Sequence, residues 1–413
     1  MKTIEYNWDF KKSNTKEFTH CFHAYPAMMI PQIARRLISN YGKSATLLFD
    51  PYCGSGTSLV EANLQDIQAI GTDLNPLARI IAKAKTTPLD LKLLDAKLVE
   101  FNDYLYESSF REDISRDFIP DFPNIDFWFD KDAQSQLAII KSFIYSIDNE
   151  DIKNFFIVAF SETIRESSYT KKGEFKLVRI PETKRNSFKI NAFDIIFSKL
   201  KRNRKGIEHF IKAKKNGSSA KIYSFNTVIN IPEDAVRPKS IDLVVTSPPY
   251  GDSRTTVAYG QYSRLSSQWL DIPNASAIDK KLMGGNKLTY ENILPSEILH
   301  DTLKKIDEED SKRMEEVYSF FQDYFFSIKN VAEILKSGAH SCYVVGNRTV
   351  KNVNIPMDAI TADFFDNNGF EHIQTIVRNI PNKRMPSMNS PSNEKGKKGS
   401  TMKNEYIVIC RKQ

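Results

Sequence analysis

Residues 241–254 read IDLVVTSPPYGDSR, an apolar run that stops at two consecutive prolines. The apolar residues at 241 and 243–245 predict a short buried strand in the middle of a sheet, with both faces covered. Prolines cannot donate to a sheet ladder, so the strand ends at Thr246 and the backbone beyond it is fixed. Open parallel sheets bind ligands at this carboxyl edge. The stretch therefore predicts an α/β fold with a site where the strand ends.

The corner after the strand suits an exocyclic amine on a flat ring. Ser247 offers a hydroxyl, the prolines offer carbonyls without competing N–H groups, and Tyr250 offers an aromatic face. We predict a catalytic corner of Ser247, Pro248, Pro249 and Tyr250, in which Ser247 and the Pro248 carbonyl accept the amine hydrogens. Taken alone, the pattern also fits a surface Pro-Pro turn with a packed tyrosine.

A second segment, residues 45–85, has the pattern of a βαβ unit. A buried strand ends at Asp50, a Gly-rich turn and a helix follow, and a second strand ends at Asp73. Glycines let the backbone approach a ligand, and a carboxylate at the second strand end suits ribose hydroxyls. The turn reads GSG rather than G-x-G-x-x-G, so an adenosine-containing cofactor without phosphates fits better than a dinucleotide. Asn75 and Pro76 predict the N-cap and first residue of the next helix.

These segments resemble a known enzyme family. FDPYCGSGT (49–57) followed by GTDLNP (71–76) resembles the S-adenosylmethionine-binding motifs of amino-methyltransferases. TSPPY (246–250) resembles their catalytic motif in the form usual for DNA cytosine-N4 methyltransferases. FHAYPAMMIP (22–31) resembles the family segment that closes over the methionine end of the cofactor. Three separated motifs agree in order and context, which makes the resemblance specific.

The resemblance covers roughly residues 20–90, 220–270 and, more loosely, 315–413. It implies a Rossmann-like class I methyltransferase fold, with a mixed, mostly parallel seven-stranded sheet, helices on both faces and an antiparallel terminal strand pair. It implies S-adenosyl-L-methionine as cofactor, with S-adenosyl-L-homocysteine as product. The substrate would be double-stranded DNA whose target base is flipped out, since a stacked base cannot reach such a corner.

Site residues follow from the same motifs, and no metal is expected. The residues expected to bind the cofactor are His23, Tyr25, Pro26, Asp50, Tyr52, Cys53, Gly54, Ser55, Gly56, Thr57, Asp73, Leu74, Asn75, Asn226 and Thr246. Asn226 stands where related enzymes usually carry an acidic residue near the adenine. In this family the loop after the corner helps to frame the target base, and the residues expected to do so are Asp252, Ser253, Arg254, Tyr259 and Tyr262.

The rest of the chain suggests three parts. Residues 1–90 would be a polar N-terminal arm and the cofactor-binding half, and residues 91–220 a mostly helical, basic insertion that helps to grip DNA. Residues 221–413 would be the catalytic half, with a lid or recognition insert at about 271–312. The basic stretches of the insertion contain grouped candidates for DNA contact, namely Arg165, Ser168, Lys171, Lys172 and Lys176. Lysine-rich helix faces are also often simply solvated.

Composition narrows the function classes. The 413 residues carry a net charge of +7, which fits a polyanionic partner without requiring one. The four cysteines lack metal-ligand spacing, and no run of eighteen apolar residues or N-terminal signal segment occurs, which predicts a cytoplasmic protein that does not contact the membrane. A cognate restriction endonuclease is expected as a genetic partner. The sequence does not specify the oligomeric state or the recognition site.

Several alternatives differ in what they require. Cytosine-C5 methylation needs a nucleophilic cysteine, usually after a proline, and none of the four cysteines follows one. Adenine-N6 methylation stays open, because the same corner serves either amine, although Asp or Asn is commoner than Ser at its first position. RNA guanine-N2 methylation and a non-catalytic DNA-binding subunit are weaker alternatives. The glycine spacing argues against a dehydrogenase.

Overall fold

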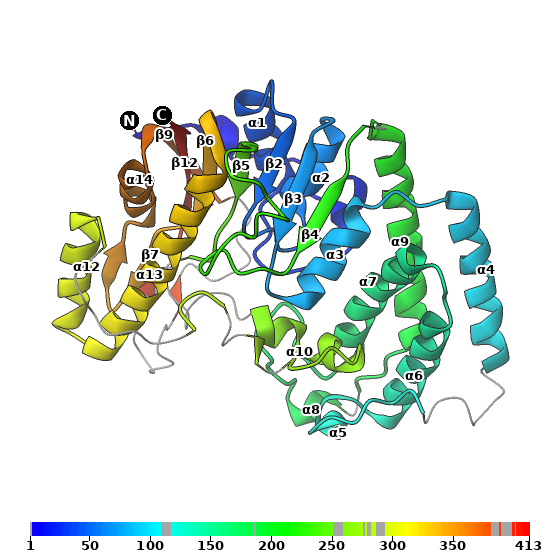
Figure 1. Ribbon diagram of the computed structural model, residues 1–413. Coiled ribbons are helices and arrows are strands. Elements are labelled where there is room, and N and C mark those ends of the chain that lie inside the picture. Colours follow the sequence, from blue (N-terminus) through cyan, green and yellow to red (C-terminus); the bar gives the residue numbers. More distant parts are fainter. Residues whose placement is uncertain are drawn as a thin grey trace.

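The computed structural model describes residues 2–108, 117–185, 187–215, 217–250, 259–275, 277–278, 282–285, 294–380, 388–389, 399–400 and 402–413. Its centre is an eight-stranded sheet in the order β1-β9-β12-β6-β5-β2-β3-β4 (Figure 1). The strands are β1 (Lys2–Ile4), β2 (Leu47–Asp50), β3 (Gln68–Thr72), β4 (Ala220–Tyr223), β5 (Ile241–Thr246), β6 (Leu335–Val345), β9 (Phe370–Asn379) and β12 (Asn404–Lys412). Only β12 runs antiparallel to its neighbours in this sheet, so the predicted mixed sheet with an antiparallel terminal pair is confirmed.

Strand β5 is buried on both faces, which explains its unbroken apolar sequence. Leu243 and Val245 pack on the face covered by α1 (Pro31–Tyr41) and α2 (Thr57–Leu64). Val244 points to the opposite face and packs in a core with three other helices. These helices are α12 (Glu297–Asp307), α13 (Ser311–Ile334) and α14 (Met357–Asn367). Helices therefore cover both faces of the sheet, as predicted.

The eighth strand comes from the segment predicted as a polar arm. Strand β1 pairs in parallel with β9 at the sheet edge, and the short helices η1 (Tyr6–Trp8) and η2 (Phe18–Cys21) follow. Trp8 is 2% exposed, and the buried Asp9 accepts a hydrogen bond of 2.8 Å from the Asn379 backbone N–H. Because the segment is polar on average, its sequence does not reveal that Trp8 and Asp9 are buried.

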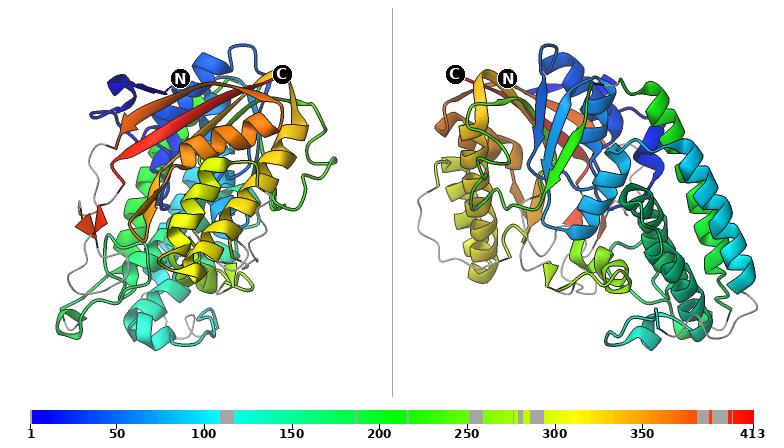
Figure 2. Two further views of the ribbon diagram at one scale, coloured as in Figure 1. Left: turned by 90° about the vertical axis from the view of Figure 1, so that its left-hand side faces the viewer. Right: turned by 45° about the vertical axis from the view of Figure 1, so that its right-hand side comes forward.

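A helical lobe follows α3 (Pro76–Thr86) in the chain and precedes β4, as predicted, and its core is shared with α3 (Figure 2). Its helices are α4 (Leu91–Ser108), α5 (Ile125–Trp128), α6 (Lys131–Tyr145), α7 (Glu150–Ser167), α8 (Glu182–Arg185) and α9 (Ala192–Ala213). Helix α10 (Tyr259–Trp269), which follows β5 by only a few residues beyond the corner, also packs into this core. The lobe therefore links the two halves of the methyltransferase sequence.

Three segments add detail to this fold. A hairpin of β7 (Arg348–Val350) and β8 (Val353–Ile355) follows β6. Helix α12 falls within the range predicted as a lid, and it packs on α13 through buried leucines and isoleucine. Of the basic loop before β12, the structure describes a short pair, β10 (Met388–Asn389) and β11 (Gly399–Ser400). None of the helices in the described ranges has the length and apolar character needed to cross a bilayer.

Candidate active site

The carboxyl ends of four neighbouring strands meet at one pocket. Asp50 ends β2, Asp73 follows β3, Asn226 follows β4 and Ser247 follows β5, and all four line an open pocket of about 960 Å³. Thr246, the last residue of β5, donates a hydrogen bond of 2.6 Å to Asp50 and ties the two central strands together. Parallel strands bring residues distant in sequence to one edge, so the motifs predicted separately converge here.

Most of the predicted cofactor residues line this pocket. They are Tyr25, Pro26, Asp50, Tyr52, Cys53, Gly54, Ser55, Thr57, Asp73, Leu74, Asn75 and Asn226. Thr246, Gly56 and His23 lie behind the wall instead. Gly56 has φ +79° and packs against Ala82, where a Cβ would come within 3.0 Å, so its role is to start α2 close to α3.

Of the residues predicted to be catalytic or to frame the base, some line the pocket and others do not. Ser247 and Pro249 line the pocket, whereas Pro248 is buried and Tyr250 packs behind Ser247. Tyr259 lines the pocket, and Tyr262 packs edge-on against Tyr25 of the pocket wall. Three further predicted residues lie outside the described ranges: Asp252, Ser253 and Arg254.

The glycine turn and the acid after β3 form one unit. Asp73 accepts hydrogen bonds from the backbone N–H groups of Gly54 (3.0 Å) and Asn75 (2.7 Å). Gly54 has φ +48°, and a Cβ there would meet no protein atom closer than 4.0 Å, so it would occupy ligand space rather than clash with the protein. Burial raises the pKa of Asp73. Each carboxylate oxygen keeps a lone pair for the hydroxyls of a ribose.

Asp50 is a buried carboxyl beneath the same turn. It accepts hydrogen bonds from Ser58, Thr246 and the Tyr52 backbone N–H. Burial raises its pKa to about 6, and these hydrogen bonds oppose that rise. The carboxyl is therefore mostly ionised at pH 7 and becomes neutral in mildly acidic solution.

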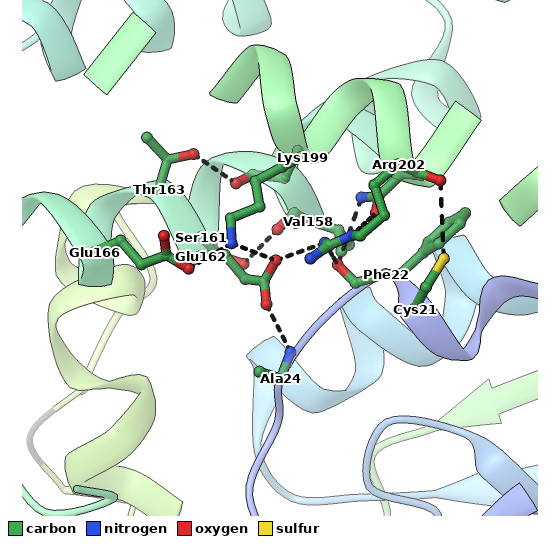
Figure 3. A network of polar contacts seen from close by, with 12 residues as sticks. Cys21, Phe22, Ala24, Val158, Ser161, Glu162, Thr163, Glu166, Lys199 and Arg202 are labelled. Carbon is green, nitrogen blue, oxygen red and sulfur yellow. Dashed lines mark hydrogen bonds and ion pairs between the residues drawn. The ribbon is translucent and has the colours of Figure 1, made fainter. Parts of the chain in front are cut away.

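The segment that carries Ala24 is attached to the helical lobe (Figure 3). Glu162 of α7 accepts a hydrogen bond of 2.7 Å from the Ala24 backbone N–H and pairs with Arg202 of α9 at 2.6 Å. Arg202 also donates to the Phe22 carbonyl at 2.7 Å. Removing one partner from a buried ion pair costs about 3–5 kcal/mol. The lobe therefore fixes the position of the pocket wall that follows Ala24.

His23 is buried within this segment and does not reach the pocket. Burial lowers its pKa to about 4, so the imidazole is neutral near pH 7. Neither ring nitrogen has a hydrogen-bond partner among the described residues. The ring lies 6.4 Å from Tyr25 and 6.2 Å from Tyr262, measured between ring centroids. The structure thus gives His23 a packing position behind Tyr25.

Tyrosines from distant segments form the wall nearest α10. Tyr25 stacks on Tyr259 with centroids 6.0 Å apart and meets Tyr262 edge-on at 6.0 Å. The Tyr25 hydroxyl accepts a hydrogen bond of 3.0 Å from Asn75, which also caps α3. Tyr262 donates to the Ala24 carbonyl at 2.7 Å. The wall is therefore rigid and aromatic at the point where a flat ring would enter.

The corner after β5 orients the Ser247 hydroxyl. Its Oγ donates to the Val344 carbonyl at 3.1 Å and lies 3.1 Å from the Tyr250 hydroxyl. Tyr250 is in turn 3.5 Å from Glu405, and burial raises the pKa of Tyr250 well above its usual value. A Cβ on Gly346 would approach the Tyr250 ring to 2.8 Å, so glycine is needed for this packing.

Sequence reasoning missed several apolar residues of the pocket. Met28 and Met29 lie within the predicted segment 22–31 but were not named as site residues, Phe225 precedes Asn226, and Leu282 and Met283 come from the expected lid region. A strand end followed by an aromatic residue was the available signal for Phe225, which stacks on Phe49 of β2 at 6.4 Å. No local pattern marks Leu282 or Met283, because their segment is polar overall.

The lining fits S-adenosylmethionine better than a phosphorylated cofactor. The described residues that line the pocket include Asp50 and Asp73 but no lysine, arginine or histidine. Two carboxylates would repel phosphates, whereas they suit a ligand with a sulfonium and an ammonium group. Apolar side chains and Phe225 offer surfaces for an adenine ring. Within the described part of the chain, no cluster of His, Cys, Asp or Glu is placed to hold a metal ion.

The chain is similar to several known methyltransferases. The DNA methylase family (N6_N4_Mtase) matches residues 2–83. Type II methyltransferase M.MvaI of Kocuria varians is 38% identical over 97% of this chain and 93% of its own length. Type II methyltransferase M.MjaII of Methanocaldococcus jannaschii is 30% identical over 23% of this chain and 19% of its length. Among solved structures, the rRNA methyltransferase aviRa of Streptomyces viridochromogenes covers 94% of this chain and 88% of its own, at 12% identity and a TM-score of 0.34.

Proposed function

Because the chain belongs to the S-adenosylmethionine-dependent DNA methyltransferases of the N4/N6 type, we propose that it methylates the N4 amine of cytosine in double-stranded DNA. The observation that carries this proposal is the orientation of Ser247 at the pocket. Its hydroxyl hydrogen is donated to the Val344 carbonyl, which leaves Oγ with lone-pair capacity to accept a hydrogen bond, and Ser247 lines the pocket. A donor there would repel an amino group, whereas an acceptor attracts one.

Bound S-adenosylmethionine supplies an activated methyl group on a sulfonium. We propose that it is held by the Gly54 turn, Asp73 and the apolar residues beside Asn226, with Tyr25 and Pro26 at the methionine end. The reaction then needs little general acid–base catalysis, and most of the rate acceleration comes from positioning of the two substrates and from electrostatic stabilisation of the transition state.

The corner would act on the target amine. The lone pair of that amine is delocalised into the ring, so acceptors on its N–H groups help it to become tetrahedral and to carry developing positive charge. Ser247, which lines the pocket, is the proposed acceptor, and Tyr250 supports Ser247 through the 3.1 Å hydroxyl contact. Because the corner lies inside a pocket, the cytosine must leave the duplex to reach it.

Serine at position 247 supports cytosine over adenine, since serine is usual at this position of the motif in cytosine-N4 methyltransferases, whereas Asp or Asn is commoner in adenine-N6 methyltransferases. The similarity to a Type II methyltransferase also supports a role in a restriction–modification system, with a cognate endonuclease encoded elsewhere. Such a role would place the protein in the cytoplasm with its DNA.

The test is methyl transfer from labelled S-adenosylmethionine to mixed-sequence duplex DNA, followed by mass spectrometry of the digested nucleosides. N4-methylcytosine is the expected product. N6-methyladenine would refute the base assignment while keeping the reaction, and label only in an RNA substrate would refute the DNA assignment.

A further inference from the structure

Helix α10 exposes a single polar stripe. Between Gly260 and Trp269 the accessible side chains are Gln261, Arg264 and Gln268, and the remaining residues in that interval are buried. Their spacing of three and four residues places them on one face of the helix. The other residues of the helix pack in the core of the lobe, for example Leu265 and the fully buried Trp269.

This stripe forms one wall of a second open cleft, of about 1200 Å³, separate from the cofactor pocket. Phe127 and Trp128 of the α5 segment and Leu177 also line this cleft. The Leu177 backbone N–H donates to Gln261 at 3.4 Å, which holds the basic segment 169–190 against α10. We refer to this feature as the α10 cleft.

The α10 cleft is electropositive and incompletely hydrogen-bonded. The Nε atoms of Arg264 and Arg179 are buried and have no hydrogen-bond partner among the described residues. The Arg179 guanidinium lies over the Phe127 ring, 3.9 Å from its centroid. Segment 169–190 contains seven basic and two acidic side chains. Both arginine side chains are partly accessible although their Nε atoms are buried, and their charge favours a ligand rich in acceptors.

The acidic side chains around the cleft are already engaged. Asp126 pairs with Lys131 at 2.6 Å, and Asp271 pairs with Lys141 at 2.7 Å. Glu182 is 3.0 Å from Arg185. These three carboxylates are therefore paired with a lysine or arginine other than Arg264.

Helix α10 contributes residues to both the active site and the α10 cleft. Tyr259, the first residue of α10, lines the cofactor pocket. At about 1.5 Å per residue, the stripe from Gln261 to Gln268 lies roughly 3–14 Å farther along the helix. That span corresponds to about one to four base-pair steps of 3.4 Å in duplex DNA. A duplex with its target base in the pocket would pass the cleft with neighbouring base pairs.

We propose that the α10 cleft reads the base pairs that flank the target cytosine, with Gln261, Arg264 and Gln268 contacting base edges. Arginine binds guanine and glutamine binds adenine through paired hydrogen bonds, which these side chains can make from one helix face. Lys171, Lys172 and Lys176 are exposed on segment 169–190 and would contact phosphates. Two residues earlier grouped with them have internal roles, since Ser168 is buried and Arg165 lies over Tyr262. This inference rests on the proposed DNA methylation.

The test compares sequence preference rather than activity alone. Wild type and Arg264→Lys, which keeps the charge but loses the planar fork, are given a duplex library with random bases around cytosines, and methylated sites are identified by sequencing. We expect kcat/KM at the preferred site to fall roughly 5- to 150-fold for Arg264→Lys, with relaxed preference at one flanking position. Arg237→Lys, on an exposed loop far from the cleft in sequence, is the matched control and should change neither value.

Each outcome decides between the two proposals. Affinity for S-adenosylmethionine and melting temperature should be unchanged in Arg264→Lys, which separates misfolding from lost readout. An unchanged site preference in Arg264→Lys and in Gln268→Ala would overturn the α10 cleft as the reading surface, while wild-type activity would leave DNA methylation standing. A wild-type protein that methylates no DNA would overturn both.

Discussion

Replacing Ser247 with alanine should slow methyl transfer without weakening cofactor binding. Ser247 Oγ lines the pocket and makes contacts of 3.1 Å to Val344 and Tyr250, whereas its methylene does not contribute to the Gly54 turn. A hydrogen bond to a group that develops charge contributes about 2–3 kcal/mol. Losing it only in the transition state lowers the rate roughly 30- to 150-fold. The two neutral contacts add about 1–2 kcal/mol to the cost in folding stability.

The assay is single-turnover transfer from labelled S-adenosylmethionine at saturating enzyme and cofactor, beside calorimetric titration of the cofactor. Ser39→Ala is the matched control, because Ser39 is exposed on α1 and its hydroxyl donates to Gln65, away from the pocket residues. The single-turnover rate should fall in Ser247→Ala alone, at an unchanged cofactor dissociation constant. A wild-type rate in Ser247→Ala, or a loss that follows the dissociation constant, would refute the acceptor role.

Three further predictions test other parts of the site. Asp73→Asn leaves one of two backbone N–H groups unpaired and removes the charge, so calorimetry should show a cofactor dissociation constant at least 10-fold higher; an unchanged constant would contradict the ribose assignment. Asp50 has a folded pKa of about 6 against an ordinary 3.8, so the folded state binds the extra proton and stability from this group is lost as pH rises. The unfolding free energy of Asp50→Asn, relative to that of wild type, should therefore be about 1 kcal/mol higher at pH 7 than at pH 5. The same difference between variant and wild type in denaturation curves at both pH values would disprove this. Gly346→Ala places a Cβ 2.8 Å from the Tyr250 ring and should reduce transfer at least 10-fold with cofactor affinity retained, which the same two assays would reveal.

The parts predicted well from sequence are those with local signals. The strand that ends at Asp50, the glycine turn and the Asn75 cap each depend on residues within a few positions of one another. The edge geometry of parallel strands then brings Asp50, Asp73 and Ser247 to one pocket, because every such strand ends on the same side.

The parts that were not foreseen depend on long-range packing. His23 lies in the segment with the expected motif, yet the side chain turns toward Glu162 and the lobe, which no local pattern encodes. Leu282 reaches the pocket from a mostly polar segment. The sequence did not predict the α10 stripe either, because packing against α7 and the α5 segment determines which α10 residues are buried.

The pairing of β1 with β9 has a consequence for how the protein is made. Lys2 lies opposite Thr375, and Arg378 donates to the Trp8 carbonyl at 2.8 Å while it pairs with Glu405, the neighbour of Tyr250. At 5–20 residues per second, a ribosome needs about 20–75 s to reach β9 after it has made β1. Throughout that interval the first strand has no partner, and the support behind the catalytic corner does not exist. Nascent chains that lack β9 and β12 should therefore be inactive, and the enzyme becomes competent only after these strands have been made.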